Sequence, residues 1–260
     1  MRTSLQTTPW IGENNGVRIP ALDYEHGEGL GVYMVRTAPT EIAKNTYEVT
    51  LVKPDGMRYK PGSAMKWYEL LPDGTYARHR TLSMVSSPHE PFLVFAYRGS
   101  QSDFKSRFLP SLKVGDTVYL RNPQDEMRYV PGEEPLLMIA GGIGITPMMS
   151  LLRYAACIHA ERPIILLYAN PTQAKEAYRV ELDEYATHHS LSIKRFYSDE
   201  GSSIQSSDIT PYVSLQPHVY IAGPESMTRT LRSAVLAAGV RESQVQVTDF
   251  TGYGAHAGFE

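Results

Sequence analysis

An apolar run at residues 136–139, LLMI, leads directly into the segment AGGIGITP at residues 140–147. A strand that ends in a glycine turn and opens a helix brings backbone N–H groups and a helix N-terminus toward a phosphate. Gly141 and Gly142 permit a tight turn with positive φ, and Gly144 removes a side chain where a ligand has to approach the backbone. Pro147 is then expected as the first helical residue. The segment predicts a dinucleotide-binding turn, with an ordinary strand-to-helix turn as the alternative.

The rest of the chain divides into parts with different patterns. Residues 1–29 lack clear periodicity and predict an irregular N-terminal arm. Residues 30–130 contain six short β-rich runs between turn residues, which predicts an antiparallel β-barrel domain. Residues 131–253 alternate apolar strands with amphipathic helices, the pattern of a Rossmann-like α/β domain with a parallel sheet. Residues 254–260 are a C-terminal tail. The predicted fold class is therefore a two-domain chain, barrel first and α/β domain second.

Composition narrows the class of function. The formal net charge of -3 is spread along 260 residues without a basic cluster, so nucleic acid is not an expected partner. No apolar run approaches the roughly 20 residues of a membrane span, and the N-terminus lacks the apolar core of a signal peptide, so a cytoplasmic location is expected. The only cysteine, Cys157, excludes an internal disulfide and any four-thiolate metal site within this chain. The histidine spacing is not typical of a metal site, and we expect no bound metal.

Two segments of the first part carry groups that suit a large anionic ligand. Arg80 stands three residues before Ser83 in RTLSMVSSP, so a charge and a hydroxyl can meet different parts of one ligand if the strand bends. Ser102 or Asp103 is expected to cap a short helix near residues 104–109, whose N-terminus and Lys105 favour phosphate. A half-buried strand and a simple capped helix are the alternatives when each segment is taken alone.

The second part repeats the arrangement of strand, glycine turn and helix. In IAGPESM, residues 221–227, Gly223 and Pro224 follow an apolar strand. Two such turns at strand ends of one parallel sheet face the crevice in which ligands bind. The last predicted strand, VQVTDF, places Phe250 and then Tyr253 near the C-terminus, where core packing and ligand stacking are both open.

As a set, these motifs resemble the ferredoxin-NADP(+) reductase superfamily. The motifs are RTLSMVSSP on a barrel strand, SDFK at a helix start, GGIGITP, LLYAN and IAGPESM at strand ends, and DFTGY at the close. The similarity covers about residues 30–253, in the family's order, and does not include the arm. It implies a barrel that binds FAD, a Rossmann-like domain that binds a nicotinamide dinucleotide, and hydride transfer from nicotinamide C4 to flavin N5.

The resemblance implies a role for each matching residue. Arg80 would pair with the FAD pyrophosphate, and Ser83, Thr146 and Phe250 are the expected catalytic residues beside the reacting atoms. Leu82 stands where the family has an aromatic residue, and Ala222 where many relatives carry cysteine. The expected cofactor-binding residues are Arg80, Thr81, Leu82, Ser83, Val85, Ser86, Ser102, Phe104, Lys105, Gly141, Gly142, Gly144, Ile145, Thr146, Asn170, Asp199, Gly223, Pro224 and Phe250.

Charge favours NADH over NADPH as the electron donor. Relatives that use NADPH place arginines after the second and third strands of this sheet, whereas this chain has Asn170 and Asp199-Glu200 there. A carboxylate repels a 2′-phosphate and accepts a hydrogen bond from a ribose 2′-hydroxyl. Lys194 and Arg195 are the two cations that could reverse the preference.

The predicted function is that of an FAD-dependent oxidoreductase that takes hydride from NAD(P)H and passes electrons singly to a separate acceptor. Ferredoxin, flavodoxin or an oxygenase component are the expected protein acceptors. One alternative is an NAD(P)H-dependent reductase of free flavin, ferric chelates or quinones. The other is a non-catalytic, flavin-binding electron-relay subunit of a complex.

Overall fold

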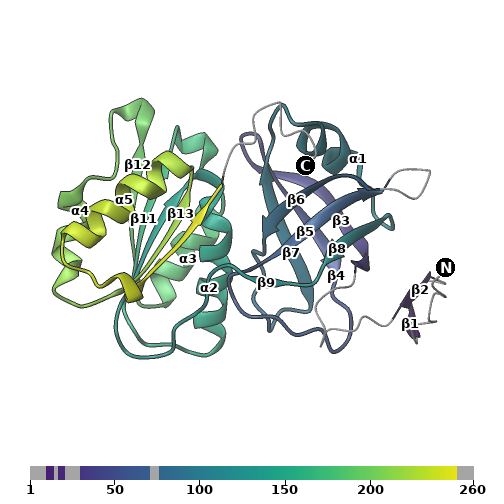
Figure 1. Ribbon diagram of the computed structural model, residues 1–260, viewed down its shortest axis with the longest axis horizontal. Coiled ribbons are helices and arrows are strands. Elements are labelled where there is room, and N and C mark those ends of the chain that lie inside the picture. The colour runs from purple at the N-terminus through teal and green to yellow at the C-terminus, as the bar shows by residue number, and fades with distance from the viewer. Residues whose placement is uncertain (1–9, 15–16, 21–29, 71–75, 251–260) are drawn as a thin grey trace, which may run out of the picture.

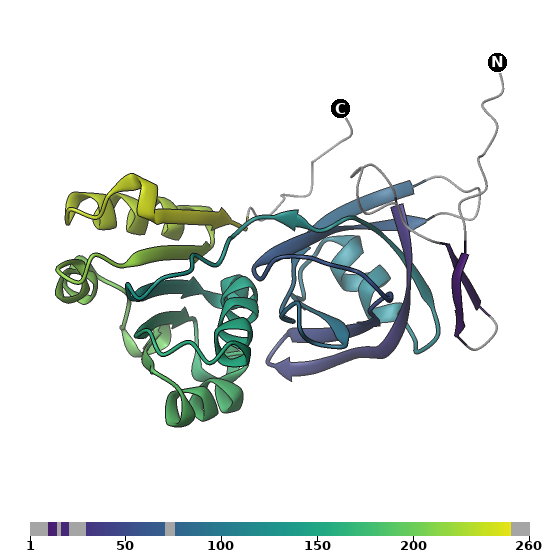
Figure 2. The ribbon, with the colours of Figure 1, turned by 90° about the horizontal axis from the view of Figure 1, so that it is seen from below.

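Seven antiparallel strands form the larger of the two main sheets (Figure 1). The computed structural model describes residues 10–14, 17–20, 30–70 and 76–250. In the order β6-β5-β8-β3-β4-β7, a bridge between Met84 and Phe95 brings the two ends together, and the sheet curls into a barrel (Figure 2). The strands are β3 (Leu30–Ala43), β4 (Thr46–Val52), β5 (Ser63–Leu70), β6 (Tyr76–Ser83), β7 (Phe92–Arg98), β8 (Thr117–Arg121) and the short β9 (Gln124–Asp125), which pairs with β5.

Inward-facing side chains of the strands fill the barrel. Met65 and Trp67 of β5 are fully buried, while Lys66 between them is only partly buried. The Trp67 ring meets Phe95 of β7 edge-on, with 5.0 Å between ring centroids. Because successive residues of a strand point to opposite faces, the same alternation decides which residues of the neighbouring β6 face the core.

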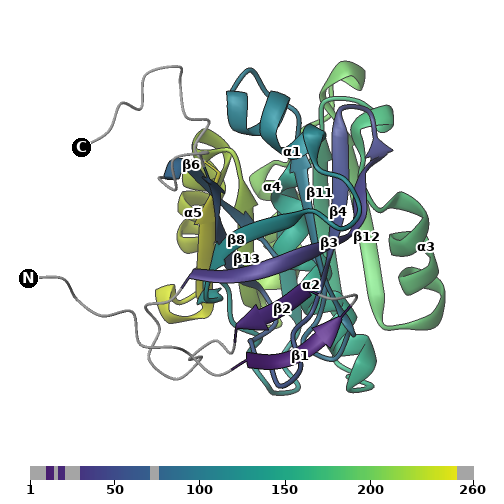
Figure 3. The same cartoon turned by 90° about the vertical axis from the view of Figure 1, so that its right-hand side faces the viewer.

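The N-terminal arm holds a hairpin that the sequence interpretation did not anticipate. Strand β1 (Trp10–Asn14) pairs antiparallel with β2 (Val17–Pro20), and the register places Asn14 opposite Val17. Figure 3 shows this pair in front of the barrel, and Figure 1 shows it at the outer end of the barrel half. Asn15-Gly16 stands between the two strands in the sequence, and Asn-Gly is a strong signal for a two-residue hairpin turn. That dipeptide was the signal that could have predicted the hairpin.

The second half of the chain forms a five-stranded parallel sheet. Its order is β12-β11-β10-β13-β14, and every neighbouring pair is parallel. Together with the barrel, this sheet confirms the predicted two-domain fold class. The strands are β10 (Leu136–Gly141), β11 (Ile164–Asn170), β12 (Leu191–Tyr197), β13 (His218–Gly223) and β14 (Val245–Asp249). The main helices are α2 (Ile145–Cys157), α3 (Arg179–His188), α4 (Ser206–Val213) and α5 (Glu225–Ala237). Shorter helical turns are η1 (Phe104–Phe108), α1 (Leu109–Ser111), η2 (Gly142–Gly144), η3 (Gln173–Lys175), η4 (Ser198–Glu200) and η5 (Glu242–Gln244).

Helices cover both faces of the parallel sheet. Alternate residues of β10 belong to different apolar clusters: Met138 packs with α2 and α3, and Ile139 packs with α4 and α5. Helix α2 therefore lies between the sheet and the barrel, while α4 and α5 cover the far face (Figure 1). Among the described residues, no helix combines the length and apolar character needed to cross a membrane.

The barrel and the α/β half share a packed interface built on α2. Val85, Val94, Ala96 and Met127 of the barrel half belong to the same buried cluster as the apolar side chains of α2. Within it, the Ser150 hydroxyl donates a hydrogen bond to the Ser86 carbonyl (2.7 Å) and accepts one from the Gly62 amide (3.0 Å). A backbone bond from Lys44 to Ala174 (2.8 Å) adds a second connection. These contacts fix the position of the barrel relative to the α/β half, and with it the positions of the predicted motifs in the two halves.

Tyr178 joins α3 to the barrel through a partly buried hydrogen bond. Its hydroxyl donates to Glu48 Oε2 of β4 (2.7 Å). Tyr178 has a left-handed backbone with φ of 61°, which costs a non-glycine residue roughly 1–3 kcal/mol. Such a conformation persists only when the surroundings hold it, and the contact with Glu48 is one such restraint.

We expect Glu48→Gln to weaken the pH dependence of stability. Burial raises the pKa of Glu48; the Tyr178 hydrogen bond and Arg153 oppose the rise, and Glu181 and Glu90 add to it. The folded protein therefore holds this proton more tightly than the unfolded chain does, and stability is lost as pH rises above 4.5 through the raised pKa. Urea unfolding across that interval should show a flatter curve for the glutamine variant. Glu133→Gln, a change at an exposed carboxylate, is the control, and an equal flattening there would refute the assignment to Glu48.

Candidate functional site

The carboxyl ends of the five parallel strands lie at one edge of the second sheet. The last residues of β10 to β14 are Gly141, Asn170, Tyr197, Gly223 and Asp249. The chain adds β11 and β12 on one side of β10 and then crosses to add β13 and β14 on the other side. In open α/β sheets, ligands bind in the crevice outside the carboxyl ends at this switch in strand order. The predicted glycine turn follows β10 and thus lies at the switch point.

Gly142 and Gly144 stand where a residue with a side chain would be strained or would collide with the backbone. Gly142 has φ of +54°, in the left-handed region. Gly144 has no room for a side chain, because a Cβ there would lie 2.1 Å from the Ala222 carbonyl oxygen at the end of β13. Gly141 is extended, with φ of -114°, so the prediction of a positive φ is wrong for it and right for Gly142. The prediction for Pro147 is also wrong by two residues, since α2 begins at Ile145.

The side chains that follow the turn point into the protein. Ile145 is fully buried, and Thr146 is 1% exposed. The Thr146 hydroxyl donates to the Ile143 carbonyl (2.9 Å), an interaction within the first turn of α2. The surface that this segment offers to a ligand is therefore backbone at a helix N-terminus rather than the Thr146 hydroxyl.

Arg98, the last residue of β7, reaches from the barrel to the glycine turn. Its Nη1 atom lies 2.8 Å from the position of a Cβ on Gly142, and Nη2 donates to the Lys175 carbonyl (3.4 Å). Its Nε is buried and has no hydrogen-bond partner, and no ion pair to Arg98 occurs among the described residues. Burial lowers the pKa of Arg98.

A half-buried guanidinium without a counter-charge is costly unless an anion pairs with it. Arg98 therefore has the properties of an anion-binding group at the mouth of the crevice. No sequence motif singled out this residue, since it belongs to the barrel and is distant in sequence from the glycine turn. The signal that could have found it is its position directly before Gly99-Ser100, ahead of the SDFK segment.

Strand β6 presents the expected FAD-binding motif on two faces. Leu82 is 4% exposed and pairs with Met65 in the barrel core. Arg80 lies opposite the buried Trp67 and is half-buried, while Thr81 on the other face is exposed. The alternation places Thr81, Ser83 and Val85 on the outer face.

Val85 and Ser86 serve the interface between the two halves. Val85 is fully buried in the cluster shared with α2. The Ser86 hydroxyl accepts hydrogen bonds from the Val94 amide (3.0 Å) and the Tyr59 hydroxyl (3.1 Å). This hydroxyl, predicted to continue along a cofactor, is thus occupied by contacts within the protein.

Ser83 is paired with a carboxylate that no motif predicted. Its hydroxyl, 2% exposed as a residue, donates to Glu126 Oε2 (3.2 Å). Burial raises the pKa of Glu126, and the hydrogen bond from Ser83 opposes that rise. The preceding Asp125 has a different environment, because Lys60 (2.7 Å) and Arg128 (3.3 Å) neutralise it. The different environments of these two neighbouring acids are visible only in the tertiary structure.

The expected cap of the short helix is made by backbone and not by a side chain. The Ser102 carbonyl accepts the amides of Lys105 and Ser106, both at 2.9 Å. Asp103 makes no capping bond and instead pairs with Arg78 (2.6 Å). Phe104 is fully buried in the barrel core.

Two cations gather where this helix meets β6. Burial lowers the pKa of Lys105, and the positive charge of the nearby Arg80 lowers it further. Among the described residues, no ion pair to Lys105 occurs. Two like charges held together in a half-buried place form a suitable site for an anion such as a pyrophosphate.

Phe250 lies between the sheet edge and the interface of the two halves. Its amide donates to the Gly223 carbonyl (2.9 Å), and its ring packs against the cluster that contains Val85 and Ala222. Pro224 is exposed at the start of α5, Asp199 is exposed in η4, and Asn170 is 4% exposed. Tyr253 lies outside the described residues. Ile143 and Ile145 beside the glycine turn, Phe250 and Val85 therefore belong to or pack against one apolar cluster.

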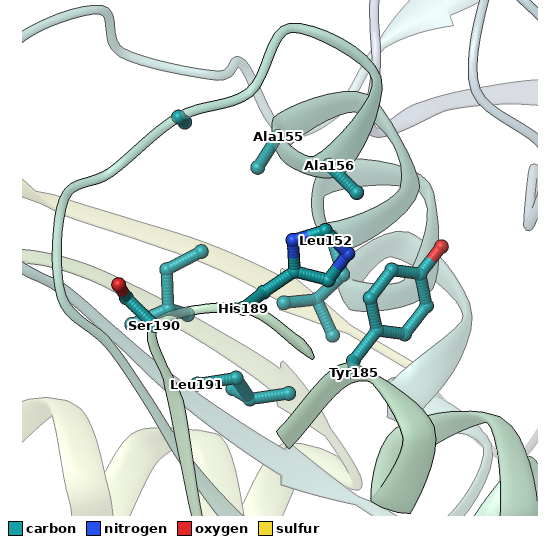
Figure 4. A pocket seen from close by; sticks show the side chains of 9 residues that line it. Leu152, Ala155, Ala156, Tyr185, His189, Ser190 and Leu191 are labelled. Atoms are coloured by element: carbon teal, nitrogen blue, oxygen red, sulfur yellow. The ribbon is translucent and has the colours of Figure 1, made fainter. Parts of the chain in front are cut away.

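Two hollows occur away from the crevice. Figure 4 shows a cavity of about 10 Å³ lined by residues such as Leu152, Tyr185 and His189, near the amino ends of β11 and β12. It is too small for an organic cofactor. A groove of about 550 Å³ runs between the barrel and α2 and α3, where Glu90 and Glu181 are already paired with Arg153 (3.2 and 2.7 Å). The groove is lined in part by Ser87, which belongs to the predicted segment RTLSMVSSP.

Comparison with known proteins supports this assignment of the two halves. Residues 138–233 match the model of the oxidoreductase NAD-binding domain. The carnitine monooxygenase reductase subunit of Escherichia coli (strain K12) is 28% identical over 188 residues, which is 69% of this chain and 57% of that subunit. The chain thus spans little more than half the length of this relative.

Solved structures match both halves together. One is the flavohem-like FAD/NAD-binding domain of nitric oxide dioxygenase from Vibrio cholerae O1 biovar El Tor, with a TM-score of 0.74, 20% identity, and coverage of 85% of this chain and 98% of that one. Another is ferredoxin-NADP+ reductase from Plasmodium falciparum with 2′P-AMP, with a TM-score of 0.72, 18% identity, and coverage of 84% and 95%. At these identities the likeness concerns the fold. The NAD-binding domain match and the two-domain fold agree with the resemblance of the motifs to the ferredoxin-NADP(+) reductase superfamily.

Proposed function

We propose that this protein is an FAD-dependent oxidoreductase that takes hydride from NADH and passes electrons one at a time to a separate acceptor. The observation that carries the proposal is the meeting of Arg98 with the Gly142 turn. A guanidinium without a counter-charge reaches from the barrel to a helix N-terminus at the switch point of the parallel sheet. This arrangement suits the pyrophosphate of a dinucleotide.

The barrel residues fit FAD. Arg80 and Lys105 place two positive charges near each other where a pyrophosphate would pair with both, and the backbone near Ser102 adds donors. The Ser83 hydroxyl, which donates to Glu126 Oε2, would donate to the flavin near N5 in place of that carboxylate when FAD is bound. Phe250, which packs against the cluster that contains Val85, would stack on the flavin ring. Thr81 is exposed on the same strand as Ser83, whereas Leu82, Val85, Ser86 and Phe104 are buried and would support the cofactor site from within the protein.

The sheet edge fits the nicotinamide dinucleotide. Gly142 and Gly144 let its phosphates approach the backbone, and Arg98 adds charge from the opposite side. Gly141, Ile145, Thr146, Gly223 and Pro224 form the turns that position it. Bound FAD supplies the ability to accept two electrons as hydride and release them singly. Each NADH then reduces two one-electron acceptors and releases one proton, while the protein aligns the reacting atoms.

A titration with NADH under anaerobic conditions tests the proposal. The purified protein loaded with FAD is mixed with NADH, and the flavin absorbance near 450 nm is followed as a generic flavin signal. We expect the oxidised flavin band to bleach with about one NADH per flavin. Stable FAD binding without any bleaching would contradict the proposal and would favour the non-catalytic electron-relay subunit instead.

We expect NADH to be preferred over NADPH by about tenfold or more in kcat/KM, a difference of roughly 1.4 kcal/mol. Asp199 is exposed after β12, where a 2′-phosphate would meet a carboxylate. The two cations that could reverse the preference are already paired: Lys194 with Asp208 (2.5 Å), and Arg195 with Asp183 (2.5 Å) and Glu176 (2.6 Å). Steady-state rates with both cofactors measure the ratio. A tenfold preference for NADPH would show that these pairs do not neutralise the site.

The acceptor is proposed to be a protein component such as an oxygenase, by analogy with the carnitine monooxygenase reductase subunit. Reduction assays with ferredoxin, flavodoxin, cytochrome c, free FMN and ferric citrate separate a protein acceptor from a small-molecule one. A rate with free FMN that exceeds every protein acceptor would favour the flavin-reductase alternative.

A further inference from the structure

A buried carboxylate lies between two arginines at the edge of the parallel sheet. Glu176 follows η3, and its side chain has 0% exposure. Its Oε1 atom accepts Arg195 Nε (2.6 Å), and its Oε2 atom accepts Arg179 Nη1 (3.4 Å) and the Tyr197 hydroxyl (2.5 Å). Tyr197 is the last residue of β12 and pairs in register with Asn170, the last residue of β11. The cluster therefore lies at the carboxyl ends of the two strands that flank the expected adenosine end of the dinucleotide.

The two arginines are close enough to solvent for an anion to reach them. The side chain of Arg179 is 40% exposed, and that of Arg195 is 21% exposed. Free guanidinium groups at this edge would bind a phosphate through several donors. Glu176 removes that capacity because it occupies donors of both groups and supplies the opposite charge.

Tyr197 helps to keep Glu176 in place. Burial and the hydrogen bond to Glu176 raise the pKa of Tyr197 to about 12, so its phenol keeps its proton and donates to the carboxylate. Arg179 Nη1 also lies 3.3 Å from the Tyr197 oxygen. The four side chains form one connected network rather than a set of separate surface pairs.

We propose that Glu176 determines the choice between NADH and NADPH by holding Arg179 and Arg195 away from a 2′-phosphate. The inference rests on the proposed function, because it assigns a selectivity to the dinucleotide site. Glu176 acts through the arginines and is a positioning residue. The carboxylate at Asp199 repels the phosphate directly, whereas Glu176 withholds the cations that would attract it.

Binding measurements test the inference without catalysis. Isothermal titration calorimetry on the FAD-loaded protein gives the Kd values of ADP-ribose, 5′-AMP and 2′,5′-ADP. For wild type we expect ADP-ribose to bind, and 2′,5′-ADP to bind no more tightly than 5′-AMP. For Glu176→Gln we expect the affinity for 2′,5′-ADP relative to 5′-AMP to rise about tenfold, as expected for a gained charge-assisted contact.

Asp183→Asn is the matched control, since it removes one negative charge from Arg195 but leaves Glu176 in place. We expect Asp183→Asn to change the affinity for 2′,5′-ADP relative to 5′-AMP much less than Glu176→Gln does. An equal gain in both variants would mean a general charge effect and would overturn the inference, as would no gain in Glu176→Gln with ADP-ribose binding retained. If wild type binds no ADP-ribose, the proposed dinucleotide site itself fails.

A second variant covers the case in which Glu176→Gln does not fold. In wild type, Arg195 is held by two carboxylates, so Arg195→Gln should leave the ratio of the two affinities unchanged. A large loss of 2′,5′-ADP affinity in Arg195→Gln would show that Arg195 already binds the 2′-phosphate, and the inference would be wrong.

Discussion

Gly144→Ala is expected to abolish most NADH-dependent flavin reduction and to destabilise the protein. The added Cβ would lie 2.1 Å from the Ala222 carbonyl oxygen and 2.9 Å from the Gly223 amide nitrogen, and these backbone atoms cannot move aside as a flexible side chain can. Overpacking of this kind costs about 1–3 kcal/mol. The turn after β10 must shift, and a displacement of about 1 Å can slow a positioned reaction on the order of a hundredfold.

Stopped-flow reduction by NADH and urea unfolding measure the two effects of Gly144→Ala. Gly115→Ala is a matched glycine-to-alanine control. Gly115 has φ of +92° and open space around it, so the substitution costs backbone strain without a collision. Gly115 precedes β8 in the barrel and lies outside the crevice. We expect the control to lose stability and keep its reduction rate, so an equal loss of rate in both variants would mean that the effect is not local.

Arg98→Ala is expected to weaken NADH binding without weakening the fold. Hydrogen bonds to charged groups contribute about 1.5–3 kcal/mol, which corresponds to an increase in Kd of roughly 10- to 100-fold. The free energy of unfolding should stay the same or rise, because the substitution removes a half-buried charge whose Nε has no hydrogen-bond partner. Few binding residues combine these two effects.

Calorimetry with ADP-ribose and urea unfolding together check Arg98→Ala. Arg98→Lys keeps the charge but not the forked donors, and it should recover part of the affinity. Arg107→Ala serves as the control, since Arg107 is exposed and pairs with Glu69 on the barrel (3.4 Å). Unchanged ADP-ribose affinity in Arg98→Ala would remove the observation on which the proposed function stands.

Some site residues could be predicted from neighbouring residues in the sequence, and others are brought into the site only by folding. The glycine turn could be predicted because a strand, a turn and a helix lie next to one another in the chain. Arg98 could not be predicted in the same way, because it lies in the barrel and meets Gly142 only after the two halves pack. Asp125 and Glu126 are adjacent acids in the sequence, yet one is neutralised by cations and the other is paired with Ser83.

Several local details also depended on packing. Thr146 and Ser86 were predicted to be cofactor-binding residues, and in the folded chain the hydroxyls of both make hydrogen bonds within the protein. Polar side chains near a strand end have many backbone partners within reach, and the sequence does not state which partner is closest. The same reason explains why Asp103 pairs with Arg78 instead of capping the helix.

The sequence by itself determined the fold class, the order of barrel and α/β halves, and the position of the glycine turn, because period-2 and helical patterns and turn residues act over a few residues. The tertiary structure alone decided which charges are neutralised. Glu176 lies in a polar stretch that resembles an exposed loop, and only the folded chain shows its carboxylate with 0% exposure between Arg179 and Arg195. Electrostatic pairing depends on distance in space and on burial, and neither is encoded in local periodicity.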